Sequence, residues 1–302
     1  MAAIPVGEAA LAGFDVIRRK PGAVLAWGGV FFVYLLVIMA FMFASVSSVA
    51  GLEIEGGEPD LAAVIGMQMM LMGVQFVITA ASFVVRVVLT CAVYRAVLEP
   101  EDSRTAYMRL GKIELLVGLV TLCVGIIVGM LIFGAAFIGA GVTIAAWFAS
   151  RPLAVLLGVA LLIGFVALLA WVGLRMAMAV PMTFAERRIR IFEAWDLTRG
   201  HVGELFLMML IVIAVVIAIE AVVVFAGVLA IVAAVGAGGM MDLSALSTLD
   251  GPALMARLAA FTPLFLLCGV VLAILSAVVH TIVVAPWAVA YRAIAPVGES
   301  PA

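Results

Sequence analysis

The chain has 302 residues, of which 68% are hydrophobic and 11% are charged, and its formal net charge is −2. Soluble domains contain about 25% charged and about 45–50% apolar residues, so this composition excludes a water-soluble globular protein. The net charge is too close to zero to indicate a nucleic-acid partner.

Six apolar segments, each long enough to cross a bilayer as a helix, follow one another along the chain. A helix needs about 20 apolar residues to cross the hydrocarbon core. The segments cover residues 23–47, 63–94, 113–139, 153–180, 203–236 and 260–292. These runs are continuous and far exceed the roughly 9–11 residues of a spanning β-strand, which excludes a transmembrane barrel. The sequence predicts an all-α integral membrane protein with six transmembrane helices, forming a single membrane domain over residues 1–302.

The first segment follows Arg18, Arg19 and Lys20, as the apolar part of a signal peptide would. Its apolar stretch from Ala23 to Val46 contains 24 residues. The apolar region of a secretory signal has roughly 7–15 residues, so we expect this segment to be retained as a helix.

The basic residues alternate between the connections in a way that predicts the topology. Thirteen of the 16 fall on one side of the predicted membrane, two fall on the other side, and Arg86 lies within a span. The connection at residues 48–62, on the side of the membrane with few basic residues, contains four acidic residues and no basic one. Because positive charge is retained in the cytoplasm, both termini are predicted to be cytoplasmic.

Matching motifs indicate an internal repeat. Tyr94-Arg95-Ala96-Val97 matches Tyr291-Arg292-Ala293-Ile294, and the five-residue spacing from Arg109 to Glu114 recurs between Arg199 and Glu204. The predicted copies cover residues 8–98, 101–183 and 187–295. Each copy is predicted to be a short cytoplasmic amphipathic helix followed by a helical hairpin. Because every hairpin begins on the same side, the three repeats are predicted to be parallel.

The basic connections carry apolar residues that can face the bilayer. In residues 186–197, Ile189, Phe192 and Trp195 can share one side of a helix while a cluster of arginines reaches lipid phosphates. This pattern predicts an interfacial helix, and the alternative is a polar elbow that only turns the chain. The residues predicted to contact inner-leaflet phosphates are Arg18, Arg19, Lys20, Arg104, Arg109, Arg187, Arg188, Arg190 and Arg199.

One stretch of the chain resembles a known family. Residues 193–206, Glu-Ala-Trp-Asp-Leu-Thr-Arg-Gly-His-Val-Gly-Glu-Leu-Phe, resemble the signature before the fifth helix of YciC-like bacterial inner-membrane proteins. The same signature occurs in the membrane domain attached to some glycerophosphodiester phosphodiesterases, and residues 175–181 resemble the element just upstream. The resemblance implies a bacterial cytoplasmic (inner) membrane protein of a largely uncharacterised family. Phosphodiesterase activity belongs to a separate soluble domain, so it is not transferred to this chain.

The sequence contains no pattern that predicts catalysis. Neither a His-Glu-x-x-His motif, a Gly-x-Ser-x-Gly elbow nor a Gly-Lys-Ser/Thr phosphate loop occurs. The two histidines, His201 and His280, are too few for a histidine-rich metal site. The three cysteines, Cys91, Cys123 and Cys268, all lie in apolar runs and are not a disulfide framework. We therefore expect no enzymatic activity, no cofactor and no metal.

Three ionisable residues are predicted to lie at hydrocarbon depth: Arg86, Glu220 and His280. A charge at the centre of a spanning helix costs roughly 2.5–3.5 kcal/mol on insertion scales. If these residues meet between adjacent helices, they form a polar cluster that binds a proton, an ion or a headgroup. One alternative is a structural clamp that holds three helices together. The other is that Glu220 lies near the outer interface.

Small residues four apart suggest where helices approach one another closely. Gly125 and Gly129 have this spacing in the third apolar segment, and Ala160 and Gly164 have it in the fourth. Such spacing allows two backbones to come close in a membrane. In a chain with 29 glycines, chance also produces the pattern.

Two functional hypotheses follow. The first is a non-enzymatic protein that organises the membrane by interacting with lipids or with another membrane protein, motivated by the basic elbows and the lack of a catalytic set. The alternative is a transporter or flippase-like protein for a small or amphipathic substrate, motivated by the repeats and the buried ionisable residues. A water-filled cavity that reaches Glu220 favours transport, and a groove open to lipid favours the first hypothesis.

Overall fold

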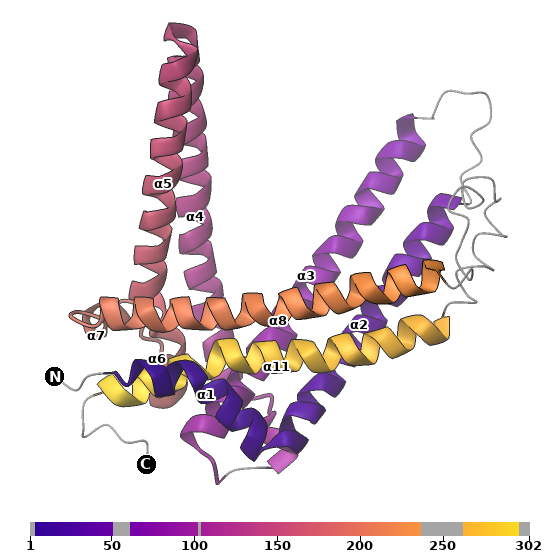
Figure 1. The fold of residues 1–302 in the computed structure, drawn as a ribbon, viewed down its shortest axis with the longest axis vertical. Helices are drawn as coiled ribbons and strands as arrows, with labels where there is room; N and C mark the ends of the chain where they lie inside the picture. The colour runs from indigo at the N-terminus through magenta and orange to yellow at the C-terminus, as the bar shows by residue number, and fades with distance from the viewer. Residues whose placement is uncertain (1–3, 51–60, 102–103, 237–261, 296–302) are drawn as a thin grey trace.

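The computed structural model describes residues 4–50, 61–101, 104–236 and 262–295 (Figure 1). This part of the chain is helical and contains no strand. Its elements in chain order are α1 (Val6–Arg19), α2 (Pro21–Ala50), α3 (Leu61–Leu98), the 3₁₀ turn η1 (Arg104–Tyr107), α4 (Lys112–Ala149), α5 (Arg151–Met176), α6 (Ala179–Glu186), α7 (Glu193–Leu197), α8 (Val202–Gly236) and α11 (Thr262–Ile294). The predicted connections at 48–62 and 237–259 lie mostly outside the described residues.

Six helices are long and apolar enough to cross a membrane, as a multi-pass membrane protein requires: α2, α3, α4, α5, α8 and α11. Each contains most or all of one of the six predicted segments, so the all-helical prediction and the number of spanning helices are confirmed. Pro21 begins α2 directly after α1, where its missing N–H and fixed φ suit a first helical position.

The predicted connection at 140–152 is wrong, because α4 continues to Ala149 and α5 begins at Arg151. No helix-breaking residue interrupts the chain before Ser150, which alone makes the turn. The Ser150 hydroxyl accepts a hydrogen bond from the Leu153 amide at 3.3 Å and thereby caps α5.

The interfacial helix expected over residues 186–197 is also much shorter in the structure. Arg187 adopts a left-handed conformation (φ 57°) and ends α6, and residues 187–192 are not helical. Arg190 then forms an ion pair with Glu186 at 2.7 Å, which holds this segment against the end of α6. Only α7 is helical here.

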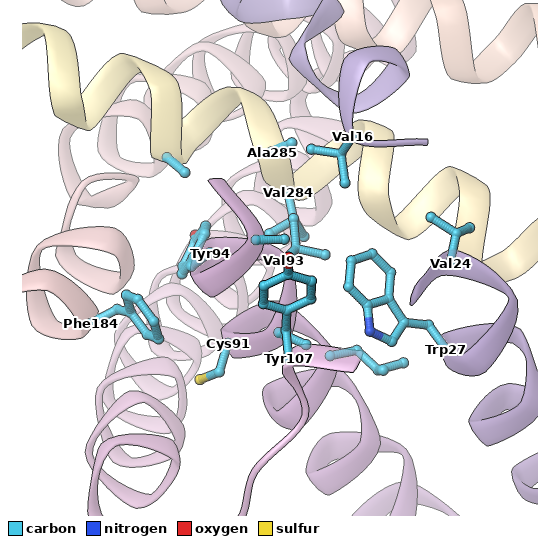
Figure 2. Packing of buried hydrophobic residues seen from close by; sticks show 14 of the residues in the cluster. Val16, Val24, Trp27, Cys91, Val93, Tyr94, Tyr107, Phe184, Val284 and Ala285 are labelled. Atoms are coloured by element: carbon cyan, nitrogen blue, oxygen red, sulfur yellow. The ribbon is translucent and has the colours of Figure 1, made fainter. Parts of the chain in front are cut away.

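The helix ends that adjoin the basic connections converge in a packed hub, which we call the basic end. Its apolar core comes from α1, the start of α2, the last turns of α3 and α11, and the short helix α6. Trp27, Phe184 and Leu205 are fully buried there. Figure 2 shows Trp27, Val93 and Tyr107 packed together with Val284 of α11. The core of this protein therefore lies at one end of the helices.

Away from the hub the α4–α5 hairpin separates from the other long helices, whereas α11 stays packed against α2, where a Cβ atom added to Gly269 would lie 3.0 Å from the Leu35 side chain. Figure 1 shows α4 and α5 running in one direction, α8 and α11 in a second, and α2 and α3 in a third. The outer half of the α4–α5 hairpin exposes large aromatic side chains, with Phe133, Phe137 and Phe148 more than three-quarters exposed. Such extended apolar surface is stable only in contact with lipid or another protein.

Glycines set the closest helix contacts in the hub. A Cβ atom added to Gly13 of α1 would lie 2.5 Å from the Ile282 Cα of α11, so the two backbones touch. A Cβ atom added to Gly28 of α2 would lie 3.3 Å from the Ile274 Cα of α11. By contrast, a Cβ added to Gly125 or Gly129 meets nothing within 4 Å, so these two glycines make no close helix contact among the described residues.

Candidate functional site

A buried ion pair links α3 to α4 at the basic end. Arg95 and Glu114 are only 3% and 6% exposed, and Arg95 donates a hydrogen bond to Glu114. Arg95 also donates to the Tyr107 carbonyl at 2.6 Å, and its guanidinium lies 5.6 Å from the centre of the Phe184 ring. Both charges are therefore satisfied within the hub, as buried charges must be.

The turn η1 has a backbone conformation that L-residues avoid. Thr105, Ala106 and Tyr107 have φ values of 49°, 53° and 66°. A left-handed residue costs roughly 1–2 kcal/mol, so such a turn persists only where its surroundings hold it. Trp27 Nε1 donates to the Ala106 carbonyl at 2.9 Å, and Lys20 donates to the Tyr107 hydroxyl. The turn thus fastens the first hairpin to the second.

A second arginine lies beside two tryptophan rings, which contact each other edge to face with centroids 5.0 Å apart. The Arg175 guanidinium lies 5.7 Å from the centre of the Trp171 ring and 5.4 Å from that of Trp195. It also donates to the Trp195 carbonyl at 3.1 Å, which ties α7 to the end of α5. Arg175 Nε is buried and has no hydrogen-bond partner among the described residues.

The start of the described chain is anchored to α8. Glu204 accepts a hydrogen bond from the Ile4 amide at 3.1 Å, and its other contact is with His201 Nδ1 at 3.0 Å. The spacing of Glu204 after Arg199 matches that of Glu114 after Arg109. The two acidic residues therefore occupy matching motif positions and both bind another element at the basic end.

The arginines and lysine predicted to contact lipid phosphates divide into two groups. The exposed ones without an ion pair in the described residues are Arg18, Arg19, Arg104 and Arg188. Arg109 is also exposed. The others are bound within the protein: Lys20 to Tyr107, Arg187 to Glu99 at 3.7 Å, Arg190 to Glu186 at 2.7 Å, and Arg199 to Asp196 at 3.4 Å. Lys20 in particular points into the hub, where it also donates to the Pro100 carbonyl at 3.1 Å.

The structure brings together two of the three ionisable residues predicted at hydrocarbon depth. His280 Nε2 lies 3.4 Å from the hydroxyl of Thr90, which follows Arg86 by one turn of α3. Glu220 is exposed on α8. Within the described residues it has no hydrogen bond, ion pair or electrostatic contact with Arg86 or His280.

An apolar groove runs between α3 and α4, starting at the basic end. Its volume is about 400 Å³. Every lining side chain except Glu114 is apolar, and Glu114 is already paired with Arg95. The lining residues are Phe83, Val84, Val87, Val88, Leu110, Gly111, Glu114, Leu115, Gly118, Leu119 and Leu122. Exposed Lys112 follows the lining residue Gly111 at the mouth of the groove.

Sequence reasoning missed the Arg95–Glu114 pair and the strained turn. A signal was present, because Arg95 and Glu114 both belong to motifs that recur along the chain. The charge count placed Arg95 with the other basic residues of the cytoplasmic side. Nothing local in the sequence says that this arginine is buried, since burial depends on α4 and α6 packing against it.

No family model, curated protein or solved structure matches this chain. Among the described residues, no group of three or more histidine, cysteine, aspartate or glutamate side chains could hold a metal ion. The surface features most informative about function are the α3–α4 groove and the exposed apolar side chains of the long helices.

Proposed function

We propose that this chain is a non-enzymatic multi-pass protein that binds anionic phospholipid and organises the membrane around its long apolar helices. The observation that carries this proposal is the α3–α4 groove, which is lined almost entirely by apolar residues and has the exposed Arg109 and Lys112 next to its lining residues Leu110 and Gly111. Eleven residues of helix separate Gly111 from Leu122, about 16 Å at 1.5 Å per residue. One leaflet of a hydrocarbon core roughly 30 Å thick has a similar depth, about 15 Å.

The charges near the mouth favour an anionic headgroup. Lys112 is exposed in the first turn of α4, and Arg109 is exposed just before it. No side chain caps the first turn of α4, so its amide groups add positive potential at the same place. A phosphate above the groove would lie beside these groups while one acyl chain follows the apolar lining.

The proposal includes an orientation and a repeat arrangement. The basic end faces the cytoplasm of a bacterial inner membrane, with both termini on that side, in agreement with the positive-inside rule. The three hairpins are parallel repeats, each preceded by a short basic segment. Membership of the YciC-like group stays a prediction from the motif at residues 193–206.

Lipid binding is tested with purified protein and two pairs of matched variants. Leu119→Trp fills the groove, and Leu162→Trp places the same ring on an exposed part of α5 outside it. Lys112→Gln removes charge at the mouth, and Arg151→Gln removes charge at the far end of α5. The protein is equilibrated with mixed micelles that contain phosphatidylglycerol and phosphatidylcholine, and bound lipid is counted by native mass spectrometry.

We expect the unsubstituted chain and both control variants to retain one phosphatidylglycerol in preference to phosphatidylcholine. Leu119→Trp should lose this lipid, and Lys112→Gln should lose the preference for the anionic headgroup. Equal retention by Leu119→Trp and Leu162→Trp would show that the groove is not the binding site.

A transporter or flippase-like protein is the second candidate, favoured by the pocket between α2, α3 and α11 that Arg86 lines. The two candidates differ in what reconstituted protein does to lipid movement. A flippase increases the rate at which a fluorescent phospholipid crosses a proteoliposome membrane, whereas a lipid-binding organiser leaves this rate unchanged.

A further inference from the structure

A pocket of about 210 Å³ lies between α2, α3 and α11, and its surface is mostly apolar. Four of its lining side chains are polar: Tyr34, Ser82, Arg86 and Ser276. Arg86 lies twelve residues before the end of α3 at Leu98, about 18 Å of helix from the basic end. The pocket therefore lies well inside the span, far from the exposed arginines of the hub.

The pocket is closed toward the basic end. One helical turn nearer to the hub, the Phe31 and His280 rings meet edge to face with centroids 6.0 Å apart, and His280 contacts Thr90. Beneath these residues lies the packed core around Trp27 and Val93 (Figure 2). The pocket is not fully enclosed and is partly open to the surface of the protein.

Among the described residues that line the pocket, Arg86 is the only one with a charged side chain, and none is a carboxylate. Arg86 forms no hydrogen bond or ion pair with the described residues. The nearby hydroxyls donate to their own helices, Ser82 to the Thr79 carbonyl at 2.7 Å and Ser276 to the Leu272 carbonyl at 2.8 Å. An unpaired charge at this depth is costly, so an anion from outside the chain would be strongly favoured beside it.

We propose that this pocket binds the carboxylate of a long-chain monocarboxylic acid, whose hydrocarbon chain leaves the pocket into the bilayer. A planar guanidinium presents paired N–H donors that match the two oxygens of a carboxylate. The volume equals about seven water molecules at roughly 30 Å³ each, enough for the carboxylate and the start of its chain. A carboxylic acid can also enter hydrocarbon in its neutral form, whereas a phosphate carries its charge with it.

This site goes beyond the proposed lipid groove and is independent of it. The groove uses Phe83, Val84 and Val87 of α3, whereas the pocket uses Ser82, Val85 and Arg86 on another face of the same helix. Failure of one site therefore leaves the other intact, and the variants that test them do not overlap.

The test measures binding of radiolabelled oleate to the full chain in phosphatidylcholine nanodiscs. Unlabelled oleate, oleyl alcohol and dioleoyl phosphatidic acid are the competitors, which separates a carboxylate from a neutral head and from a phosphate. Arg86→Gln removes the charge, and Arg86→Lys keeps it. Ser276→Leu fills the pocket without touching the charge, and its hydroxyl bonds only within its own helix. Arg151→Gln is the control, since this arginine lies outside the pocket.

We expect Arg86→Gln to weaken oleate binding about ten- to a hundredfold, the range expected for a lost charge-assisted hydrogen bond. Arg86→Lys should bind within a few-fold of the unsubstituted chain, Ser276→Leu should bind little oleate, and Arg151→Gln should bind normally. Oleate should compete far better than oleyl alcohol or phosphatidic acid.

Three results would overturn the assignment. They are undiminished binding to both Arg86→Gln and Ser276→Leu, competition by oleyl alcohol as strong as that by oleate, and preferential competition by phosphatidic acid. If Arg86→Gln does not yield folded protein, as judged by size-exclusion chromatography, the Ser276→Leu result decides alone.

Discussion

At the scale of single residues, the charges of Arg95 and Glu114 differ from the other charges at the basic end because water does not reach them. Exposed ion pairs gain little, since solvent screens them and both side chains lose freedom. A buried charge that loses its partner is left without solvent or counter-charge, which is strongly destabilising. The Arg95–Glu114 pair is therefore the charge interaction in the described chain on which stability depends most.

Glu114→Gln should lower the free energy of unfolding by about 3 kcal/mol, at the lower end of the range for a broken buried pair. Thermal unfolding in detergent, followed by the loss of monodisperse protein, measures the effect. Glu99→Gln is the matched control, because Glu99 pairs with the exposed Arg187 at 3.7 Å and should change stability by less than about 1 kcal/mol. Equal losses in the two variants would contradict the role of the buried pair.

The positions of ionisable residues relative to one another were only partly predictable from the sequence. Positions along the apolar segments placed Arg86, Glu220 and His280 at hydrocarbon depth but did not predict whether they meet, and in the structure His280 lies 3.4 Å from Thr90, one helical turn after Arg86. The neighbours of Glu220 could not be predicted, because they depend on how α8 lies relative to the other helices. For the same reason, the charge pattern predicted that Lys20 contacts lipid phosphates, whereas in the structure Lys20 donates a hydrogen bond to the Tyr107 hydroxyl.

At the scale of elements, α1 is fastened to the protein by backbone contact with α11. The contact is possible because Gly13 has no side chain where the two helices cross. Ala9, Ala10 and Ala12 are also buried on this face, so α1 lies closer to its neighbours than larger residues allow. The opposite side of α1 exposes Leu11 and Phe14, which can rest against lipid.

Gly13→Ala should push α1 away from α11, because the added Cβ has no space beside the Ile282 backbone. Overpacking of this kind costs about 1–3 kcal/mol. Gly7→Ala is the matched control in the same helix, where a Cβ meets nothing within 4 Å. It should leave stability unchanged or raise it slightly, since alanine favours a helix. Thermal stability and the rate of proteolysis within α1 are the measurements, and a Gly13→Ala protein as stable as Gly7→Ala would refute the contact.

The helices themselves were largely predictable, and the connections were less so. Hydropathy located all six long helices because each must satisfy the bilayer along its whole length. It placed the end of α4 ten residues early, because the far end of that helix is rich in small residues without a helix breaker. The expected interfacial helix was shortened by Arg187, whose left-handed conformation no residue pattern indicated.

At the scale of the whole molecule, the hub and the hairpins have different roles. The hub holds the buried polar network, whereas the hairpins present apolar surface that only lipid or a protein partner can cover. This division agrees with a membrane-organising function better than with a closed bundle around a central channel.

The proposed orientation is tested by labelling introduced cysteines with a maleimide that does not cross membranes. Ser150→Cys lies in the turn between α4 and α5, and Glu193→Cys lies on α7 at the basic end. In intact cells we expect labelling at position 150 alone, and labelling at position 193 only after the membrane is permeabilised. The unsubstituted chain controls for Cys91, Cys123 and Cys268, and the reverse pattern would invert the topology.

The sequence by itself determined that this chain is helical, how many of its helices can cross a membrane and roughly where each begins. These properties follow from sums over neighbouring residues, since each apolar run meets the bilayer independently of the others. Only the tertiary structure decided that Arg95 is buried against Glu114, that Gly13 rather than Gly125 brings helices together, and that the helix ends converge in a hub at the basic end. These features depend on distances between segments remote in sequence, and the packing of side chains fixes such distances only when all the helices are in place.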